Sequence, residues 1–315
     1  MKHETEGKIL DLIIIGAGPA GLSASIYASR YGVQHKIVGA LLGGQISETH
    51  KIDNYPGMED MSGFEFSQKW GNHAKKYGVE ILPNMVEKIN KEEDTFSITL
   101  ADKNILRSKT ILLATGTKKR KLNIIGEKEF IGKGVSYCAT CDGFFYKNKI
   151  VGVIGGSDSA ATATLYLADL AQKVYLIYRK AELRAEPFWV NLILKNPKIE
   201  VLYEINVVEI LGQQKLEKVK LDREYKNSKE LNLDGLFIEA GSDPATEYFS
   251  ELRIELDESG YIKIQKNGAT NVAGVFSAGD ITDGSDKFRQ VITAASEGAI
   301  SARAIYDFLK KNKMQ

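Results

Sequence analysis

Residues 8–21 of this chain, KILDLIIIGAGPAG, decide its fold. The apolar run over 8–15 predicts a buried parallel strand, and the pattern over 22–30 predicts a helix directly behind the glycines. Glycines in a G-x-G-x-x-G turn let the backbone approach a pyrophosphate, whose charge the amides and the positive end of the helix stabilise. Residues 16–21 therefore predict a dinucleotide-binding turn, although a tight strand–helix turn without a ligand fits the same pattern.

The same unit occurs again in the middle of the chain. Residues 149–154 predict a strand, 155–160 (GGSDSA) a turn, and 161–170 a helix. A repeated strand–turn–helix unit indicates an α/β protein with two nucleotide sites. Ser157 replaces the central glycine of the second turn. Its Cβ would crowd a pyrophosphate unless its hydroxyl donates a hydrogen bond to it.

The second strand of the later unit indicates which nucleotide it binds. This strand, 173–178, is followed by Arg179, Lys180 and Arg184. An NAD site places a carboxylate there for the ribose hydroxyls, whereas three cations suit a 2′-phosphate. The cluster therefore favours NADPH over NADH, against the alternative of a solvated basic turn.

The earlier unit is identified by the far end of the chain, because its own second strand, 34–38, leads into no charged cluster. Residues 274–280 predict a strand that stops at Asp280, whose carboxylate could accept hydrogen bonds from a ribityl chain or simply end a turn. Residues 289–291 open a helix predicted over 292–309. The start of that helix would stabilise negative charge on a reduced isoalloxazine, so this unit favours a flavin.

The only two cysteines, Cys138 and Cys141, are separated by two residues. A pair this close can form and open a small disulfide ring, which suits an electron-carrying dithiol. Half of a zinc site is the alternative, but zinc needs four ligands and the histidines lie far upstream without ligand spacing. The histidines are His3, His35, His50 and His73. We therefore expect a redox dithiol and no metal.

The composition is that of an ordinary soluble protein. Of 315 residues, 43% are hydrophobic and 26% charged, with a net charge of +1, which suits two domains. Residues 1–8 lack the apolar run of a secretion signal and no stretch reaches the length of a membrane span, so we expect a cytoplasmic protein. A two-cysteine disulfide in the cytosol is more often catalytic than structural. The near-zero charge offers no basic field for nucleic acid.

A series of motifs along the chain matches the pattern of one family. The motifs are GAGPAG at 16–21, GGQ at 43–45, NYPG at 54–57, ATG at 114–116, CATCDG at 138–143, AGD at 278–280 and RQ at 289–290. In this order they resemble the low-molecular-weight thioredoxin reductases, which are class II pyridine nucleotide-disulfide oxidoreductases. The resemblance covers nearly the whole chain.

This resemblance implies an α/β fold of two Rossmann-like domains of the three-layer ββα type. An NADPH-binding domain, 118–244, would carry the Cys-x-x-Cys pair and be inserted into a discontinuous FAD-binding domain, 1–117 and 245–315. It further implies a homodimeric thioredoxin-disulfide reductase that passes electrons from NADPH through FAD and the dithiol to thioredoxin or a thioredoxin-like protein.

Site residues follow from the same motifs. FAD contacts are expected from Gly16, Gly18, Pro19, Ala20, Gly21, Gly44, Gln45, Asn54, Thr115, Gly116, Gly279, Asp280, Arg289, Gln290 and Val291. NADPH contacts are expected from Gly155, Gly156, Ser157, Asp158, Ser159, Arg179, Lys180 and Arg184. Cys141 would be the thiol nearest the flavin and Cys138 the one that attacks the protein substrate. Asp142 would carry the proton, since its charge would raise rather than lower a thiol pKa, with a simple turn residue as the alternative.

Three departures from the family pattern fall in the NADPH unit: Ser157 in place of a glycine, Thr162-Ala163 in place of two glutamates, and Tyr178-Arg179-Lys180 in place of a His-Arg-Arg run. They bear on the electron donor and on the nicotinamide site, while the surface shape that selects a disulfide substrate is not coded in the motifs, so two alternatives stay open. One is a reductase of another disulfide carrier, or one with an electron donor other than NADPH. The other is a flavin-binding redox sensor whose nicotinamide site is degenerate.

Overall fold

The structure, a computed structural model, describes residues 9–312, without the side chain of Glu247. The expectations for residues 1–8, which include His3, lie outside the described residues. The chain forms two compact units: one runs to Lys118 and resumes at Asp243, and the other is Lys119–Ser242. Two short strands, β7 (Thr117–Lys119) and β16 (Ser242–Pro244), pair with each other where the chain passes between the units.

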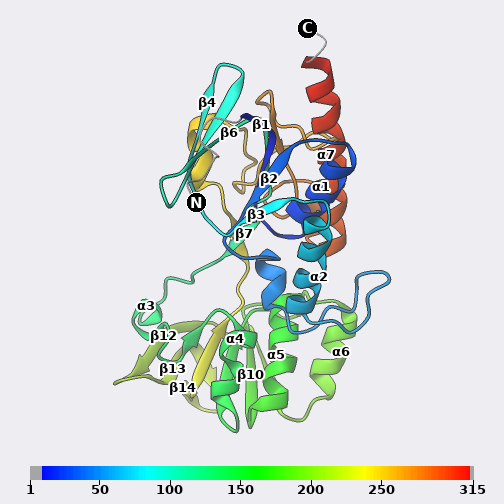
Figure 1. Ribbon diagram of the computed structural model, residues 1–315. Coiled ribbons are helices and arrows are strands. Elements are labelled where there is room, and N and C mark those ends of the chain that lie inside the picture. Colours follow the sequence, from blue (N-terminus) through cyan, green and yellow to red (C-terminus); the bar gives the residue numbers. More distant parts are fainter. Residues whose placement is uncertain (1–8, 313–315) are drawn as a thin grey trace. The chain divides into compact units, whose positions relative to one another are not determined.

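The first unit is built on a seven-stranded sheet of order β3-β2-β1-β6-β5-β4, with β17 also paired to β6 (Figure 1). Strands β1, β2, β3, β6 and β17 pair parallel with one another, whereas β5 pairs antiparallel with both β6 and β4. Their bounds are β1 Ile9–Ile15, β2 His35–Val38, β3 Glu80–Leu82, β4 Val86–Glu92, β5 Thr95–Leu100, β6 Ile105–Leu113 and β17 Val275–Ser277.

Three helices cover one face of this sheet: α1 (Pro19–Arg30), α2 (Gly63–Lys75) and α7 (Val291–Asn312). Leu12 and Ile14 of β1 pack in the core that contains residues of all three helices, and Ile13 lies in a second core with β4 and β5. Helices α1 and α7 approach very closely, because a Cβ at Gly298 would lie 2.1 Å from the carbonyl oxygen of Ala20. The remaining segments include three 3-10 turns, η1 (Gly44–Glu48), η3 (Glu247–Leu252) and η4 (Ser285–Lys287).

The second unit has a parallel five-stranded sheet of order β11-β10-β9-β15-β8 and an antiparallel three-stranded sheet of order β12-β13-β14. Their bounds are β8 Val135–Ser136, β9 Ile150–Ile154, β10 Lys173–Tyr178, β11 Ile199–Tyr203, β12 Val207–Gly212, β13 Leu216–Tyr225, β14 Ser228–Asn232 and β15 Gly235–Ile238. The helices are α3 Glu127–Phe130, α4 Ala139–Asp142, α5 Asp158–Leu170 and α6 Pro187–Lys195, with the 3-10 turn η2 Gly143–Tyr146 after α4.

Side chains of β10 and β15 point alternately into two cores. Ile177 and Leu236 join the core with the three-stranded sheet, whereas Leu176 and Phe237 join the core with α5. Figure 1 shows β12–β14 on one side of β10, and α5 and α6 on the other. The α/β class and the three-layer arrangement predicted from the sequence are therefore confirmed.

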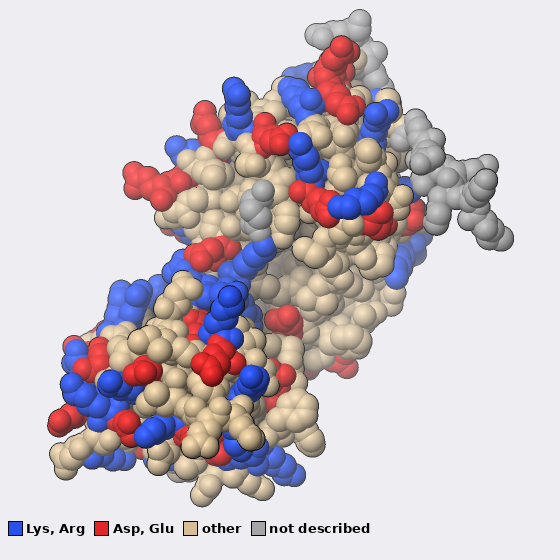
Figure 2. Space-filling view, turned by 90° about the vertical axis from the view of Figure 1, so that its left-hand side faces the viewer, with Lys and Arg blue, Asp and Glu red and all other residues tan. Residues whose placement is uncertain are grey.

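The surface carries charges of both signs. Figure 2 shows Lys and Arg side chains interspersed with Asp and Glu over the visible face of both units. No helix among the described residues is long and apolar enough to cross a membrane.

Candidate active site

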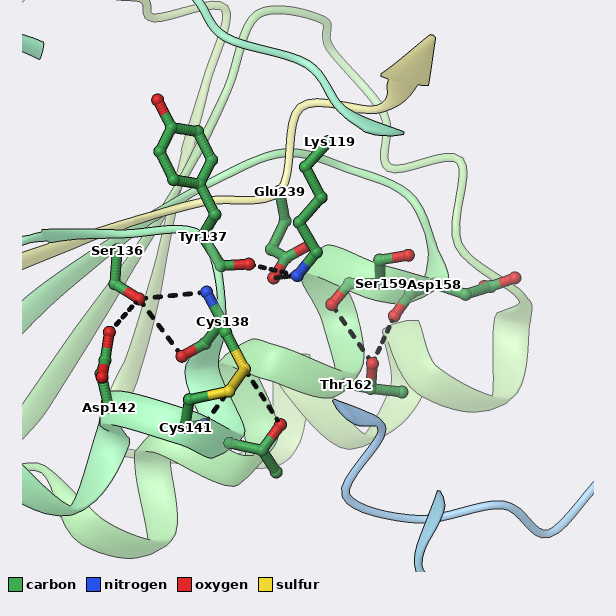
Figure 3. Close-up of polar contacts among 11 residues, drawn as sticks. Lys119, Ser136, Tyr137, Cys138, Cys141, Asp142, Asp158, Ser159, Thr162 and Glu239 are labelled. Atoms are coloured by element: carbon green, nitrogen blue, oxygen red, sulfur yellow. Dashed lines mark hydrogen bonds and ion pairs between the residues drawn. A yellow bond between two sulfur atoms is a disulfide. The ribbon is translucent and has the colours of Figure 1, made fainter. Parts of the chain in front are cut away.

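Cys138 and Cys141 form a disulfide with an S–S distance of 2.05 Å (Figure 3). They lie where the chain leaves the edge strand β8 and begins α4, a helix of a single turn. Cys138 is the N-cap residue, and its Sγ accepts a hydrogen bond from the amide of Cys141 at 3.2 Å. Cys141 is exposed and Cys138 is partly buried. Within residues 9–312, no group of three or more His, Cys, Asp or Glu side chains could hold a metal ion.

Ser136 holds the carboxylate that follows the disulfide. Its Oγ donates to Oδ2 of Asp142 at 2.6 Å and accepts from the amide of Cys138 at 3.0 Å. The hydroxyl thus fixes Asp142 beside the Cys-x-x-Cys turn, within the same unit. Sequence reasoning missed Ser136, because serine before a cysteine carries no pattern of its own.

Tyr137, the residue before Cys138, is held by hydrogen bonds of both its main chain and its side chain. The main-chain oxygen of Tyr137 accepts a hydrogen bond from Lys119, and its hydroxyl donates to the buried Glu127. Glu127 also accepts from the amides of Leu122 at 2.9 Å and Ile124 at 3.2 Å. Burial, followed by the bond to Glu127, raises the pKa of Tyr137, so this hydroxyl keeps its proton.

The glycine turn of the first unit requires glycine at both of its ends. Gly16 has φ +118°, and a Cβ on it would lie 2.0 Å from the carbonyl oxygen of Ala114. A Cβ on Gly21 would lie 1.9 Å from the carbonyl oxygen of Gly16. Gly18, the N-cap of α1, is different, because among the described residues only the oxygen of Gly43, at 3.8 Å, comes within 4 Å of its added Cβ. The turn therefore presents open space at the start of α1, as a pyrophosphate requires.

Several predicted FAD residues surround this helix start. Gly44 lies against Gly18, since its added Cβ would be 3.4 Å from the Cα of Gly18. Gly279 lies against α1 and α7, because its Cβ would meet Ala20 at 2.9 Å. Pro19 occupies the first turn of α1, where its fixed φ suits a helix start. The structure thus brings these segments together around one end of the parallel sheet.

The other predicted FAD residues bind their neighbours in the same unit. Gln45 donates to the carbonyl oxygen of Thr117 at 2.6 Å, and Thr115 donates to that of Ala245 at 3.1 Å. Asn54 donates to Oε1 of Gln290 at 3.0 Å, just before Val291 begins α7. Gly116 has φ +66° and no atom of the described residues within 4 Å of an added Cβ, which leaves open space there as well.

A carboxylate and a guanidinium lie at the end of β17 in an arrangement that fits a polar ligand. Asp280 is partly buried, and burial raises its pKa, while Arg289 opposes the rise and Glu297 adds to it. Arg289 packs 4.0 Å from the ring centroid of Tyr261, and its buried Nη2 has no hydrogen-bond partner among the described residues. A buried donor without a partner is costly, so these residues fit a group that brings its own acceptors, as a flavin nucleotide does.

Glu297 holds the turn that carries Asp280, and it lies in none of the motifs recognised in the sequence. Its carboxylate accepts from the amide of Gly279 at 2.7 Å, from Thr282 at 3.1 Å and from Ser285 at 2.6 Å. One side chain of α7 therefore fixes the whole segment from 279 to 285. No motif marks it, because its partners lie 12 to 18 residues earlier in the chain and meet it only once α7 has packed against this turn.

The glycine turn of the second unit resembles the first in its backbone. Gly155 has φ +151°, and its added Cβ would lie 2.3 Å from the carbonyl oxygen of Glu239. Gly156 lies under the ring of Tyr178, 2.4 Å from its added Cβ. Ser157 is the N-cap of α5, but its hydroxyl makes no capping hydrogen bond. Asp158 accepts from the amide of Glu186 at 2.7 Å, while Ser159 is exposed.

Thr162, one of the departures from the family pattern, turns back onto its own helix. Its hydroxyl donates to the carbonyl oxygen of Asp158 at 2.8 Å, with that of Ser159 at 3.2 Å (Figure 3). The hydroxyl is therefore engaged within the first turn of α5.

The predicted basic cluster is exposed beside this turn. The amide of Arg184 donates to the carbonyl oxygen of Gly156 at 2.6 Å, which brings the segment 179–184 next to the start of α5. Arg179, Lys180 and Arg184 are all exposed, and none forms an ion pair within the described part of the chain. The cluster is therefore available to an anionic ligand at the helix start.

A family model described as pyridine nucleotide-disulphide oxidoreductase matches residues 10–298. The chain therefore belongs to the family of pyridine nucleotide-disulphide oxidoreductases, and many of its curated relatives are thioredoxin reductases. It is 39% identical over 311 residues to the thioredoxin reductase of Helicobacter pylori, with 96% of this chain and 99% of that protein covered.

Solved structures agree with this assignment. The thioredoxin reductase of Lactococcus lactis in its FR conformation has a TM-score of 0.91 and 36% identity, covering 96% of this chain and 99% of that one. The thioredoxin reductase of T. acidophilum has a TM-score of 0.89 and 32% identity, covering 97% and 99%. The resemblance expected from the motifs is confirmed, and with it the Rossmann-like nature of both units. Membership of this family implies a flavin and a pyridine nucleotide as cofactors.

Proposed function

We propose that the chain is an NADPH-dependent thioredoxin reductase, a flavoprotein that passes electrons from NADPH through FAD and the Cys138–Cys141 pair to thioredoxin. The observation that carries this proposal is the disulfide itself. It lies on a turn, includes an exposed residue, Cys141, and has a carboxylate held beside it. A disulfide so placed suits exchange with another protein rather than a structural role.

FAD would be held by the residues expected from the sequence, from Gly16 to Gly21 at the start of α1 to Val291 at the start of α7. Two features support this: the open space beside Gly18, and the buried Nη2 of Arg289 without a partner. When bound, the flavin supplies a carrier that accepts two electrons as hydride and delivers them to a disulfide. Asp280 and Arg289 would orient it by their hydrogen bonds.

NADPH would be held in the second unit, at the start of α5. Amides of the turn 155–159 would face the pyrophosphate, and the basic cluster would bind the 2′-phosphate with Arg179, Lys180 and Arg184. The absence of ion-pair partners for these three, among the described residues, supports this assignment over a purely structural one.

The exchange with thioredoxin balances without a further reactant. The reduced pair carries two thiols; Cys138 attacks the thioredoxin disulfide, forming one mixed disulfide and releasing one thioredoxin thiolate. Cys141 then attacks Cys138, which restores the Cys138–Cys141 bond and releases the second thiolate. Asp142, held by Ser136, would accept or return a proton at its free carboxylate oxygen during these steps.

An exposed aromatic pair next to the disulfide supports a protein substrate. Phe144 and Phe145 follow the Cys-x-x-Cys turn directly, and each is 69% exposed. Large apolar side chains exposed beside a reactive group mark a surface for protein contact. We also propose that the enzyme works in the cytoplasm and that it is a homodimer. Light scattering after gel filtration would measure the molar mass and so test the dimer directly.

The function is tested by thioredoxin turnover and by trapping. Cys141→Ser should stop turnover and accumulate a stable disulfide between Cys138 and thioredoxin, because the resolving sulfur is gone. Cys138→Ser should stop turnover without this product. A trapped complex in the Cys138→Ser protein alone would exchange the two roles, and NADPH-driven turnover with both cysteines replaced would reject the mechanism.

One observation favours a second candidate, a flavin-binding redox sensor. Ser157 places a side chain where the first unit has open space, and its hydroxyl is not used for capping. A sensor of this kind would bind NADPH poorly and reduce its flavin slowly. Rapid reduction of the bound flavin by NADPH would dismiss it.

A further inference from the structure

Lys119 binds the main chain directly before the disulfide. It lies at the end of β7, and its Nζ donates to the carbonyl oxygen of Tyr137, the residue next to Cys138 (Figure 3). The same Nζ lies 3.4 Å from Oε1 of Glu239, just beyond β15. The side chains of Lys119 and Glu239 are 28% and 10% exposed, so water screens this pair only partly.

The peptide group that Lys119 binds is part of a continuous row of hydrogen bonds. Its oxygen belongs to Tyr137 and its N–H to Cys138. That N–H donates to Oγ of Ser136 at 3.0 Å, and Ser136 donates to Asp142 at 2.6 Å. An ammonium therefore stands at one end of the row and a carboxylate at the other. Hydrogen bonds arranged in this way polarise and strengthen one another.

Hydrogen bonds and an ion pair connect the main chain at Cys138 to one cation, three carboxylates and the hydroxyl of Tyr137. Lys119 is the cation, and the anions are Glu239 beside it, Asp142 behind Ser136 and Glu127 behind the hydroxyl of Tyr137. Lys119 is the one that bonds the peptide of Cys138 from its carbonyl side. A cation close to a cysteine favours the thiolate, and a nearby anion disfavours it.

We propose that Lys119 is a positioning residue for Cys138, which fixes the 137–138 peptide and promotes the thiolate of Cys138 in the reduced enzyme, while Glu239 limits this effect. The proposal rests on the proposed role of the Cys138–Cys141 pair in exchange. It assigns the pair a control on reactivity from outside the Cys-x-x-Cys motif, by two residues that belong to none of the recognised motifs.

The test is the pH dependence of Cys138 alkylation in full-length protein carrying Cys141→Ser, with its flavin as purified. Iodoacetamide reacts with the thiolate, so the pH of half-maximal rate reports thiolate formation. Adding Lys119→Met should move this midpoint upward, on the order of half a pH unit or more, and Glu239→Gln should move it downward. Lys119→Arg, which keeps the charge, should stay close to the parent protein.

Lys118→Met is the matched control. Lys118 is the neighbouring lysine, but its Nζ bonds the hydroxyl of Tyr248 at 2.8 Å rather than the disulfide turn. Its midpoint should not move. A mere loss of packing would shift the alkylation midpoints of Lys119→Met and Glu239→Gln in the same direction. Shifts in opposite directions therefore require an effect of charge.

Midpoints that move in one direction for both variants, or that do not move, overturn the proposal. So does an equal shift in Lys118→Met. If Lys119→Met fails to fold, the downward shift of Glu239→Gln and the parent-like Lys119→Arg decide the matter. The assay uses neither NADPH nor thioredoxin, so absent thioredoxin turnover with opposite shifts would reject the proposed function and leave this inference standing.

Discussion

The two glycine turns, 16–21 and 155–160, make equivalent backbone hydrogen bonds and close contacts. They differ in the side chains beside the predicted nucleotide position. The amide of Gly16 donates to Val38 at 2.7 Å, and that of Gly155 donates to Ile177 at 3.1 Å. Each first glycine also abuts the carbonyl oxygen that follows the neighbouring strand, at Ala114 and at Glu239. The repeat seen in the sequence is therefore a repeat of hydrogen bonds and close contacts as well.

A size exchange distinguishes the residues packed against each turn. In the first unit, Ala17 of the turn faces Gly39, whose added Cβ would lie 2.8 Å from that of Ala17. In the second unit the equivalent positions are Gly156 and Tyr178, with a glycine on the turn and a large ring on the last residue of the strand. The space between the turn and the strand end has room for the side chain of only one residue of each pair. A larger residue at one position therefore requires a smaller one at the other.

The central position shows the functional difference. Gly18 (φ −80°, ψ −175°) and Ser157 (φ −98°, ψ 179°) have the same extended backbone, which any residue can adopt. Ser157 is therefore unstrained, and the departure from glycine costs the fold nothing. What it changes is the space in front of the helix start, which is open at Gly18. The first turn is thus open to a pyrophosphate, and the second is narrowed by one side chain.

The largest effect is expected from the glycine that both turns share. Gly16→Ala and Gly155→Ala should each destabilise their unit by more than about 3 kcal/mol, because both combine a positive φ with a backbone clash. Urea unfolding measures the loss. Gly32→Ala and Gly132→Ala are the controls, since both glycines have positive φ but no described atom within 4 Å of an added Cβ. A tolerated Gly155→Ala would break the equivalence of the turns.

A smaller effect is expected where the second turn alone carries cations. Replacing Arg179 and Arg184 together by Ala should weaken NADPH binding at least tenfold, since each charge-assisted contact contributes about 1.5 to 3 kcal/mol before solvent screening. NADH binding, which lacks the 2′-phosphate contact, should hardly change. Isothermal titration with both nucleotides checks this. Equal losses for the two would show that the cluster is only surface.

Exchanging the central residues tests the narrowing of the second turn. Ser157→Gly should tighten NADPH binding by about threefold, which is less than 1 kcal/mol, and Gly18→Ser should weaken FAD retention. Melting temperatures should stay nearly constant, because both backbones are extended. Weaker NADPH binding by Ser157→Gly would instead identify the hydroxyl as a ligand of the pyrophosphate.

The smallest effect concerns acid stability, and it should arise in the first unit. His35 of β2 is equivalent to the buried, apolar Val174 of β10. Burial lowers the pKa of His35 below 6.5, although its bond to the Val33 carbonyl opposes this, so the folded state prefers the neutral ring. The contribution of the neutral His35 ring to stability is complete at a pH above the pKa of His35 in the unfolded chain. It is lost as the pH falls through the lower pKa of His35 in the folded protein.

In a urea series from about pH 7.5 to about pH 5.5, this loss should be under about 1 kcal/mol. His35→Gln should flatten the pH dependence by that amount. An unchanged slope in the variant would assign the dependence to other groups.

The sequence was sufficient to predict those features whose residues lie close together in the chain. Both strand–turn–helix units and the Cys-x-x-Cys pair were predicted, because local spacing determines them. Boundaries were less accurate. Helices predicted from Leu22 and Ala161 begin at Pro19 and Asp158, since proline and aspartate are favourable in a first helical turn. The strand predicted over 274–280 is only β17, Val275–Ser277, because Gly274 and Gly279 have positive φ and end it.

Residues whose partners are distant in the chain could not be predicted. Ser136, Glu297 and the Lys119–Glu239 pair have no motif, and their contacts exist only once the strands are aligned. The first unit packs Ala17 against Gly39, and the second packs Gly156 against Tyr178. This difference in residue size could not be predicted for the same reason. The sequence marked Tyr178 as a departure, but only the structure shows that its ring fills the space that Gly156 leaves.

If both turns serve one electron path that ends at the disulfide, anaerobic mixing of the flavin-loaded protein with NADPH should show it. We expect rapid loss of the visible flavin absorbance, faster than with NADH, and its recovery when oxidised thioredoxin is added. A protein with both Cys138→Ser and Cys141→Ser should lose the absorbance equally fast but show no recovery with thioredoxin. A flavin that stays oxidised with NADPH, or whose absorbance recovers with thioredoxin in the cysteine-free protein, would show that no electron path runs from NADPH through the flavin to the Cys138–Cys141 pair.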